Sequence, residues 1–463
     1  MINVYVPNPS SKLSLSIKSW ALKIIFKNQP LNIVIRNDKE PHVLIHGTNG
    51  QIIKLKDKVV DDYCLGKSLS PHNLYKLRQT DQILSKFIQK DLYSLDPKDQ
   101  IYTVNTNESS VIFLPDILGL IFQSLCSINE ITWSCKDEYG RYAEEKSIGY
   151  ELESDPYCCW IDDWISFILI KLGCNHSSQS YQPRLPILTH DVDIIKSFAD
   201  VKAYQIAKQS LYELAARKWK YYPFDKLFYW LVYNYYPRIE WNILCLFQLA
   251  KNYNQSNLDS LFYLLLDPQG QIDIGHYSYS SLWVKKFIKY AVRKNCKIGL
   301  HVSYYQSMSK DNYINALERY HLYLKSLNLT AEPYLVHTRN HFLRYNFNEA
   351  VSWMEDSNVN IDSSIGYTKR IGWRLGTRHN FRLFNLKKGR ESSVINSPFG
   401  FMDNVLIKDQ YVDLINNNLL LHELNNFLSY ETPSSLVVHP HNLHSLKSVK
   451  EFTSLVRNNL QPA

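Results

Sequence analysis

From about residue 180 onward, short apolar runs alternate with longer segments in which apolar residues recur at helical spacing. Short runs that are apolar throughout are typical of parallel strands that are buried on both faces. The helical pattern is clearest in residues 282–292, 313–327 and 449–456. Because strands and helices alternate, the pattern predicts a parallel sheet with helices packed on it.

Each predicted strand is followed by a cluster of polar residues. We count six such strand ends, which read LPILTHDVD (185–193), KIGLHVSYYQS (297–307), PYLVHTRNHF (333–342), VNIDSSIGY (359–367), SPFGFMDN (397–404) and SLVVHPHN (435–442). If the sheet closes into a barrel, the carboxyl ends of all parallel strands meet at one rim, where barrel enzymes carry their chemistry. The sequence therefore predicts a functional site at this rim.

The chain before residue 175 has a different pattern. Strand-like runs LNIVIRN, HVLIHG and QIIKL give way to helix-like segments. We therefore expect an α/β protein with an α+β N-terminal domain in residues 1–175, which has no chemistry of its own, and a distorted (β/α) barrel in residues 183–463. A helical insertion at about 200–258, broken by Pro223 and Pro237, follows the first barrel strand. It is either a packed helical cap or a face that contacts an acidic glycan or a membrane surface.

Composition adds few constraints. Lys+Arg 52 against Asp+Glu 44 leaves a net charge of +8 with no long basic run, so no nucleic acid partner is expected. The 33 tyrosines and 10 tryptophans suit stacking on sugar rings, although filling a core is their commoner use. The oligomeric state is not indicated by any of these counts.

The N-terminal residues lack the basic start, apolar centre and cleavage site of a secretory signal, so no export is expected, and no membrane span is expected either. The most apolar run of the chain, residues 111–128, is interrupted by Pro115 and Asp116, and a buried helix explains it better than a bilayer span. Its eight cysteines include no CxxC pair, which favours reduced thiols in a cytoplasmic protein.

Asp191 and Asp193 are the first candidates for chemistry. Side chains alternate along a strand, so residues two apart point the same way, and two carboxylates that close need a cation or a shared proton between them. His301 and His341 follow two other predicted strands. Carboxylate and neutral imidazole are ligands that suit zinc or a similar divalent metal with one position open for water. One aspartate could then bind the metal while the other accepts a proton from the water.

These motifs resemble the polysaccharide deacetylases of carbohydrate esterase family 4. THDVD is similar to the family's first motif, IGLHVSYYQS to the GLHPSY form of its second, and TRNHFLR to RQHYLR of a bacterial branch linked to surface-polysaccharide loci. DSSIGYTKRIGWRLGT, SPFGFMDNVL and LVVHPHN resemble later segments of the same branch. Upstream, DILGLIFQSLCSINEITWSCKDEYGRYAEEKSI resembles the N-terminal accessory domain of that branch, so that the matches span about residues 110 to 445.

The resemblance implies a metal-dependent hydrolase that removes N-acetyl groups from a glycan, on a barrel of the polysaccharide deacetylase type. It makes Asp191 the catalytic base and Asp193 and His301 metal ligands. His439 would protonate the leaving amine, with His441 as the second choice for this role. Arg339 could orient Asp191, and Asp403 or Asp362 could orient His439. Arg374 lies in the segment DSSIGYTKRIGWRLGT, which resembles a segment of the same branch.

The third metal ligand departs from the wider family, whose second motif has the form HxxxH. Here Tyr305 stands where the second histidine is expected. We choose His341 as the third ligand because it follows a neighbouring strand, and His337 is the next candidate. Tyr305 is interpreted as a rim residue that packs on substrate or on Tyr304.

Three other functions stay open. A glycosyltransferase with a DxD motif would place the carboxylates on a metal with a nucleotide sugar, but it leaves the histidines at the other strand ends without a role. A non-catalytic glycan-binding barrel would account for Tyr305 as a lost ligand. A related hydrolase could act on another acyl group or polymer.

Overall fold

The computed structural model of the protein describes residues 2–27, 29–36, 42–67, 75–76, 78–79, 92–96, 98–105, 110–132, 135–150, 157–174, 188–194, 241–256, 258–268, 272–273, 277–329, 335–406, 419–429, 435–443 and 446–460. Its contacts divide the chain into two compact units. Unit 1 comprises Met1–Arg184, Leu335–Val405 and Thr432–Ser435, and unit 2 comprises Leu185–Tyr334, Leu406–Glu431 and Leu436–Ala463.

The N-terminal residues of unit 1 form a seven-stranded mixed sheet. Its order is β2 (Leu31–Arg36), β1 (Ile2–Pro7), β3 (Val43–His46), β4 (Ile52–Leu55), β9 (Ser110–Leu114), β8 (Gln100–Asn105) and β6 (Arg78–Gln79). A two-stranded sheet pairs β5 (Tyr75–Lys76) with β7 (Tyr93–Ser94). The three strand-like runs recognised in the sequence are β2, β3 and β4.

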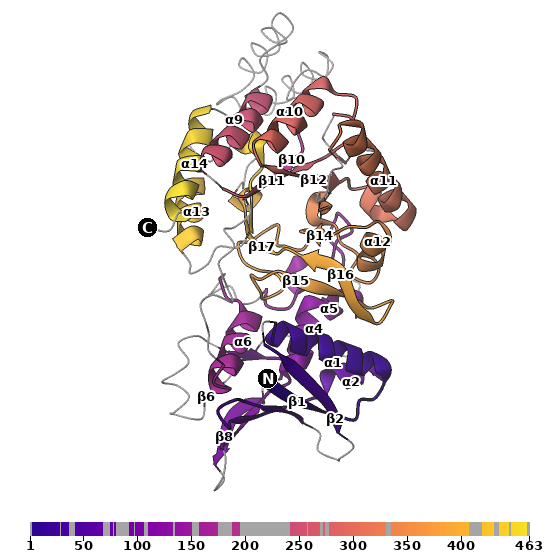
Figure 1. Ribbon diagram of the computed structural model, residues 1–463, viewed down its shortest axis with the longest axis vertical. Coiled ribbons are helices and arrows are strands. Elements are labelled where there is room, and N and C mark those ends of the chain that lie inside the picture. Colours follow the sequence, from indigo (N-terminus) through magenta and orange to yellow (C-terminus); the bar gives the residue numbers. More distant parts are fainter. Residues whose placement is uncertain are drawn as a thin grey trace, which may run out of the picture. The chain divides into compact units, whose positions relative to one another are not determined.

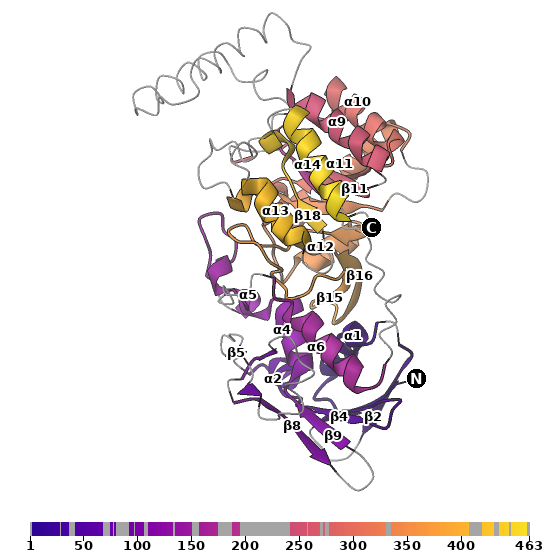
Figure 2. The same ribbon diagram turned by 90° about the vertical axis from the view of Figure 1, so that its left-hand side faces the viewer.

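Helices of unit 1 lie on one side of this sheet, as Figure 2 shows for α1 (Lys12–Ile25), α4 (Ile117–Leu125) and α6 (Trp160–Lys171). The shorter helices of this region are α2 (Val59–Cys64), α5 (Ile128–Thr132) and the 3₁₀ turn η1 (Glu144–Lys146). Helix α1 begins after Ser11, whose side chain accepts a hydrogen bond from the Ser14 amide at 3.1 Å. All nine residues of α4 are buried, which confirms that this apolar run is a core helix.

The rest of unit 1 alternates strands with short helices. Its strands run in the order β15 (Phe381–Asn385), β16 (Arg390–Asn396), β14 (Ile361–Asp362) and β13 (His337–Asn340), parallel except for the β15/β16 hairpin. The other elements are η3 (His341–Leu343), α12 (Ala350–Asp356), β17 (Phe399–Met402) and η4 (Asp403–Leu406).

Residues 335–405 pack directly against the N-terminal residues within unit 1. Trp20 donates its indole hydrogen to the Arg382 carbonyl at 2.8 Å, and Thr377 donates its hydroxyl to Asp162 at 2.6 Å. The domain boundary at 175–183 stays a prediction.

Unit 2 has four parallel strands in the order β12 (Lys297–Val302), β11 (Ser260–Leu264), β10 (Leu188–Val192) and β18 (Ser435–Val437). Every residue of β10 and β11 is buried. The helices are α9 (Trp241–Ser256), α10 (Leu282–Arg293), α11 (Lys310–Ser326), α13 (Leu419–Ser429) and α14 (Leu446–Leu460), with 3₁₀ turns η2 (Gln306–Met308) and η5 (Pro440–Leu443). Figure 1 shows α9 between α10 and α14.

The mixed α/β class that the sequence predicts is confirmed, and the three segments with clear helical spacing are α10, α11 and α14. Closure of the sheet into a barrel stays a prediction. Residues 195–240, which contain most of the predicted insertion, lie outside the described residues, and α9 forms its end. No helix among the described residues has both the length and the apolar character that a membrane span requires. None of the eight cysteines, all of which are described, forms a disulfide.

Candidate metal centre

Strand β10 places the histidine of THDVD on one side and the two aspartates on the other. His190 is fully buried, with its Nδ1 2.9 Å from the Val438 carbonyl and its Nε2 2.7 Å from the Tyr253 hydroxyl. Alternation along the strand sends Asp191 and Asp193 to the opposite side. His190 is therefore a hydrogen-bonded core residue, and the two aspartates are available to a shared site.

His301, near the end of β12, lies beside both carboxylates. Its Nε2 atom is 3.3 Å from Oδ1 of Asp193 and 3.8 Å from Oδ2 of Asp191. The side chains of His301 and Asp191 are 1% and 3% exposed, whereas that of Asp193 is 14% exposed. Asp193 is thus the member of this group with the most access to solvent.

His439 follows β18 and lies on the other side of the same carboxylate. Its Nε2 atom is 3.7 Å from Oδ2 of Asp193, and its side chain is 6% exposed. The ring of His441 lies 5.4 Å from the ring of His439, measured between centroids. His439 therefore lies beside the Asp193 carboxylate, with His441 next to it.

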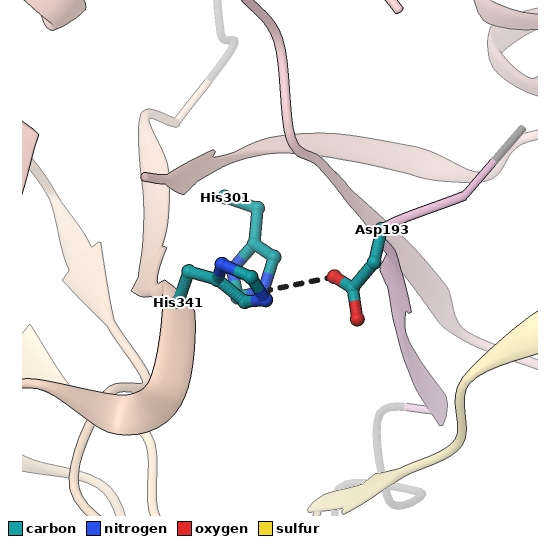
Figure 3. A group of neighbouring side chains, drawn as sticks. All are labelled: Asp193, His301 and His341. Carbon is teal, nitrogen blue, oxygen red and sulfur yellow. Dashed lines mark ion pairs between the residues drawn. The ribbon is translucent and has the colours of Figure 1, made fainter. Parts of the chain in front are cut away.

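Asp193, His301 and His341 form a group that could hold a metal ion. Each offers one ligand atom, and these atoms all lie within 4.8 Å of one another. In Figure 3 the two imidazoles overlap in the view and the Asp193 carboxylate faces them. One carboxylate and two imidazoles form the donor set of many open zinc sites, so the residues present fit the metal that the sequence implies.

Tyr305 stands where the second histidine of the HxxxH motif is expected. Its side chain is an exposed one, and its ring meets that of Tyr304 edge-on at 5.9 Å. This contact agrees with the interpretation of Tyr305 as a rim residue. His337, the other candidate for the third ligand, is buried in β13 and is not one of the three.

Arg339 and Asp362 are buried polar residues of unit 1. Arg339 donates to the carbonyl and to the hydroxyl of Ser363, each at 2.9 Å, and its guanidinium lies over the Phe399 ring. Asp362 accepts hydrogen bonds from the amide and hydroxyl of Ser364 and from the Thr338 hydroxyl. Burial raises the pKa of Asp362 to about 6. Both side chains are therefore held by hydrogen bonds to neighbouring strand ends of unit 1.

Asp403 is fully buried at the start of η4. The orienting roles proposed for Arg339, Asp362 and Asp403, and the catalytic roles of Asp191, His439 and His441, stay predictions.

Arg374, in the segment DSSIGYTKRIGWRLGT, forms a buried ion pair with Glu130. Its Nη2 atom is 2.8 Å from Oε1 of Glu130, and the two side chains are 8% and 4% exposed. Burial raises the pKa of Glu130 to about 6, while Arg374 opposes that rise. Arg374 therefore joins the loop before β15 to α5 inside unit 1.

Two residues near the strand ends had no signal in the sequence. Tyr277 is buried, donates its hydroxyl to the Val192 carbonyl and accepts from the Leu265 amide at 2.6 Å. Burial, followed by the nearby charge of Asp193, raises the pKa of Tyr277 well above its usual value. Asp273 accepts from the Tyr304 amide at 3.0 Å and so holds the turn after β12. Both lie in irregular segments, where periodicity gives no information.

Unit 1 also contains a cavity of about 310 Å³, lined by residues that include Trp20, Lys27, Phe381 and His379. None of the predicted catalytic or metal-binding residues lines it. The cavity therefore gives no support to the candidate chemistry.

No protein-family model matches the chain, and no curated protein matches it. Among solved structures, the chain is similar to a crystal structure described as that of a "putative polysaccharide deacetylase from Mycobacterium smegmatis". The identity is 13%, the TM-score is 0.36, and the match covers 59% of this chain and 82% of the other. A likeness at this level identifies neither the reaction nor the substrate of this protein.

Proposed function

We propose that the protein is a metal-dependent hydrolase that removes N-acetyl groups from a glycan, such as a bacterial surface polysaccharide or its precursor. The observation that carries this proposal is the group Asp193, His301 and His341, whose ligand atoms lie within 4.8 Å of one another. Asp191 and His439 lie beside members of this group. An acid, a base and a ligand set within one site are what amide hydrolysis requires.

The three ligands would hold a divalent metal, for which zinc is our choice. When bound, such a metal supplies Lewis-acid polarisation of a carbonyl and lowers the pKa of water. Asp193 contributes the negative charge of the ligand set, and the two imidazoles complete three of the four positions that zinc prefers. The fourth position is left for water or substrate.

Asp191 is the general base in this proposal. Its carboxylate is almost fully buried and lies 3.8 Å from His301, so it is close to the ligand set without being one of the three. A carboxylate in this position would accept the proton of the attacking water.

His439 is the general acid. Amide cleavage requires the nitrogen to leave as a neutral amine, and a protonated imidazole can deliver the proton. The contact of His439 with Asp193 brings this imidazole to the edge of the ligand set, on the other oxygen from His301. His441, whose ring lies next to that of His439, is the alternative donor.

The test measures acetate released from N-acetylated oligosaccharides by the purified full-length chain, together with its zinc content. We expect about one zinc per chain, loss of acetate release after removal of the metal by a chelator, and recovery when zinc is returned. Glycan binding without acetate release, in a chain fully loaded with metal, would favour a glycan-binding protein instead. A chain that binds no divalent metal would refute the proposal.

A further inference from the structure

The backbone directly after His341 adopts an unusual conformation. Phe342 and Leu343 have φ values of 58° and 52°, in the left-handed region that non-glycine residues rarely occupy. Such a conformation is strained for a residue with a side chain and persists only where surrounding contacts hold it. Two of them in succession, next to a candidate metal ligand, require an explanation in the contacts that this turn makes.

The contacts to Phe342 come from the turn formed by Asp137–Arg141. Arg141 donates its Nη1 hydrogen to the Phe342 carbonyl at 2.8 Å. Tyr139 stacks on the Phe342 ring, with centroids 5.0 Å apart and an angle of 26° between the planes. The same turn thus holds both the backbone and the side chain of the first left-handed residue.

The turn is itself fixed by Asp137. One oxygen of this carboxylate accepts from the amides of Tyr139 and Arg141 at 3.0 and 2.9 Å. The other accepts from Nε of Arg141 at 2.8 Å and lies 2.7 Å from Nη2. Because a guanidinium held in this way has little rotamer freedom left, its Nη1 atom is pre-organised to bind the Phe342 carbonyl.

Because Phe342 is held in place, it also restricts the position of the neighbouring His341 ring. The two rings pack with their centroids 4.4 Å apart, so that Tyr139, Phe342 and His341 form a continuous row of rings. A change in the position of Phe342 would therefore change both the backbone and the packing of the imidazole beside it.

We propose that the turn Asp137–Arg141 is a positioning element for the metal site, which holds His341 in its ligand orientation through Phe342. The inference rests on the proposed function, in that it takes His341 to be a ligand. Tyr139 and Arg141 are positioning residues and have no contact with substrate in this mechanism. The N-terminal residues accordingly contribute to metal affinity as well as to folding.

The test compares zinc affinity, measured by competition with a chromogenic chelator, in the wild type and in Arg141→Ala. Loss of partners that orient a metal ligand typically costs about 10- to 100-fold in affinity, and we expect a loss in this range. Arg370→Ala is the matched control, because Arg370 also donates to a backbone carbonyl, that of Tyr150, and lies over two tyrosine rings. We expect this control to keep the affinity of the wild type.

A second variant, Tyr139→Leu, removes the stacked ring and leaves the bonds between Asp137 and Arg141 in place. It should lose affinity in the same direction, and it keeps the inference testable if Arg141→Ala does not fold. Circular dichroism of the metal-free chains establishes that each variant is folded. If wild type and both variants bind zinc equally well, the inference is wrong and the proposed function stands. If the wild type binds no zinc, both are wrong.

Discussion

The Nε2 atom of His439 lies 3.7 Å from the Oδ2 atom of Asp193. The other oxygen of the same carboxylate is 3.3 Å from His301, so one aspartate contacts both a candidate ligand and the candidate acid. Asp191, two residues earlier, lies 3.8 Å from His301, and its side chain is 3% exposed, whereas that of Asp193 is 14% exposed. The two aspartates of THDVD therefore have different surroundings, and their replacement should have different effects.

Asp191→Asn should keep the metal and lose turnover. The amide removes the proton acceptor but leaves Asp193, His301 and His341 unchanged. General bases typically contribute about 10²- to 10⁴-fold in rate, so we expect acetate release to fall by this factor while zinc content stays near that of the wild type. Zinc content and acetate release are measured on the same preparation.

Asp193→Asn is the comparison, because it makes the same chemical change two residues away. It removes the negative charge from the ligand set and should lower zinc affinity as well as activity. Equal loss of metal in the two variants would mean that both carboxylates coordinate. The base would then have to be sought elsewhere, with His439 and His441 the first to replace.

His341→Ala tests the third ligand. Removal of a direct ligand should reduce zinc affinity by more than the about 10- to 100-fold typical of outer partners. Tyr305→Phe, which changes the residue at the position of the family's second histidine, should leave affinity unchanged. The measurement is chelator competition on folded chains, and a larger loss in Tyr305→Phe than in His341→Ala would contradict this choice of ligand.

The ion pair between Arg374 and Glu130 should stabilise unit 1 only while both partners are present. Arg374→Ala leaves a buried carboxylate without its guanidinium, and such losses typically cost about 3–5 kcal/mol in unfolding free energy. The double variant Glu130→Leu/Arg374→Met should cost less than Arg374→Ala alone, because no buried charge remains.

The control for this ion pair is Lys369→Ala, which breaks a more exposed pair with Glu145 a few residues away and should cost less than about 1 kcal/mol. Urea unfolding of the four chains measures these differences. A double variant less stable than Arg374→Ala would show that the ion pair stabilises unit 1 by more than the cost of burying its two charges.

Much of the fold could be predicted because its signals are local. The six strand ends with polar clusters all follow or overlap strands, and the helical spacing identified α10, α11 and α14. Strand β11, Ser260–Leu264, was missed although it lies between β10 and β12 in the sheet. Its run SLFYL is apolar on both faces and is not followed by a histidine, so nothing distinguished it from the end of the helical insertion.

The site was predictable to the extent that its residues follow strands. Asp193, His301 and His341 each come directly at or after a strand end, and parallel strands bring such ends together. The side chains that bind the backbone next to these residues could not be predicted in this way. Tyr277 donates to the Val192 carbonyl and Arg141 to the Phe342 carbonyl. Every residue has a backbone carbonyl, so the sequence gives no sign of which one a side chain will bind.

Glu130 should make stability depend on pH in a specific window. Its pKa rises from a usual value of 4.5 to about 6 because burial disfavours the charged carboxylate. The folded chain therefore keeps a proton that the unfolded chain releases, and the stability from this proton is complete below pH 4.5 and is lost as the pH rises through 6. At about 1.4 kcal/mol per pKa unit, the loss amounts to about 2 kcal/mol. Glu130→Gln has no such proton, so the unfolding free energy of the wild type minus that of this variant should fall by about this amount between pH 4.5 and 7. A difference that increases over the same window would mean that Arg374 favours the charged carboxylate by more than burial disfavours it.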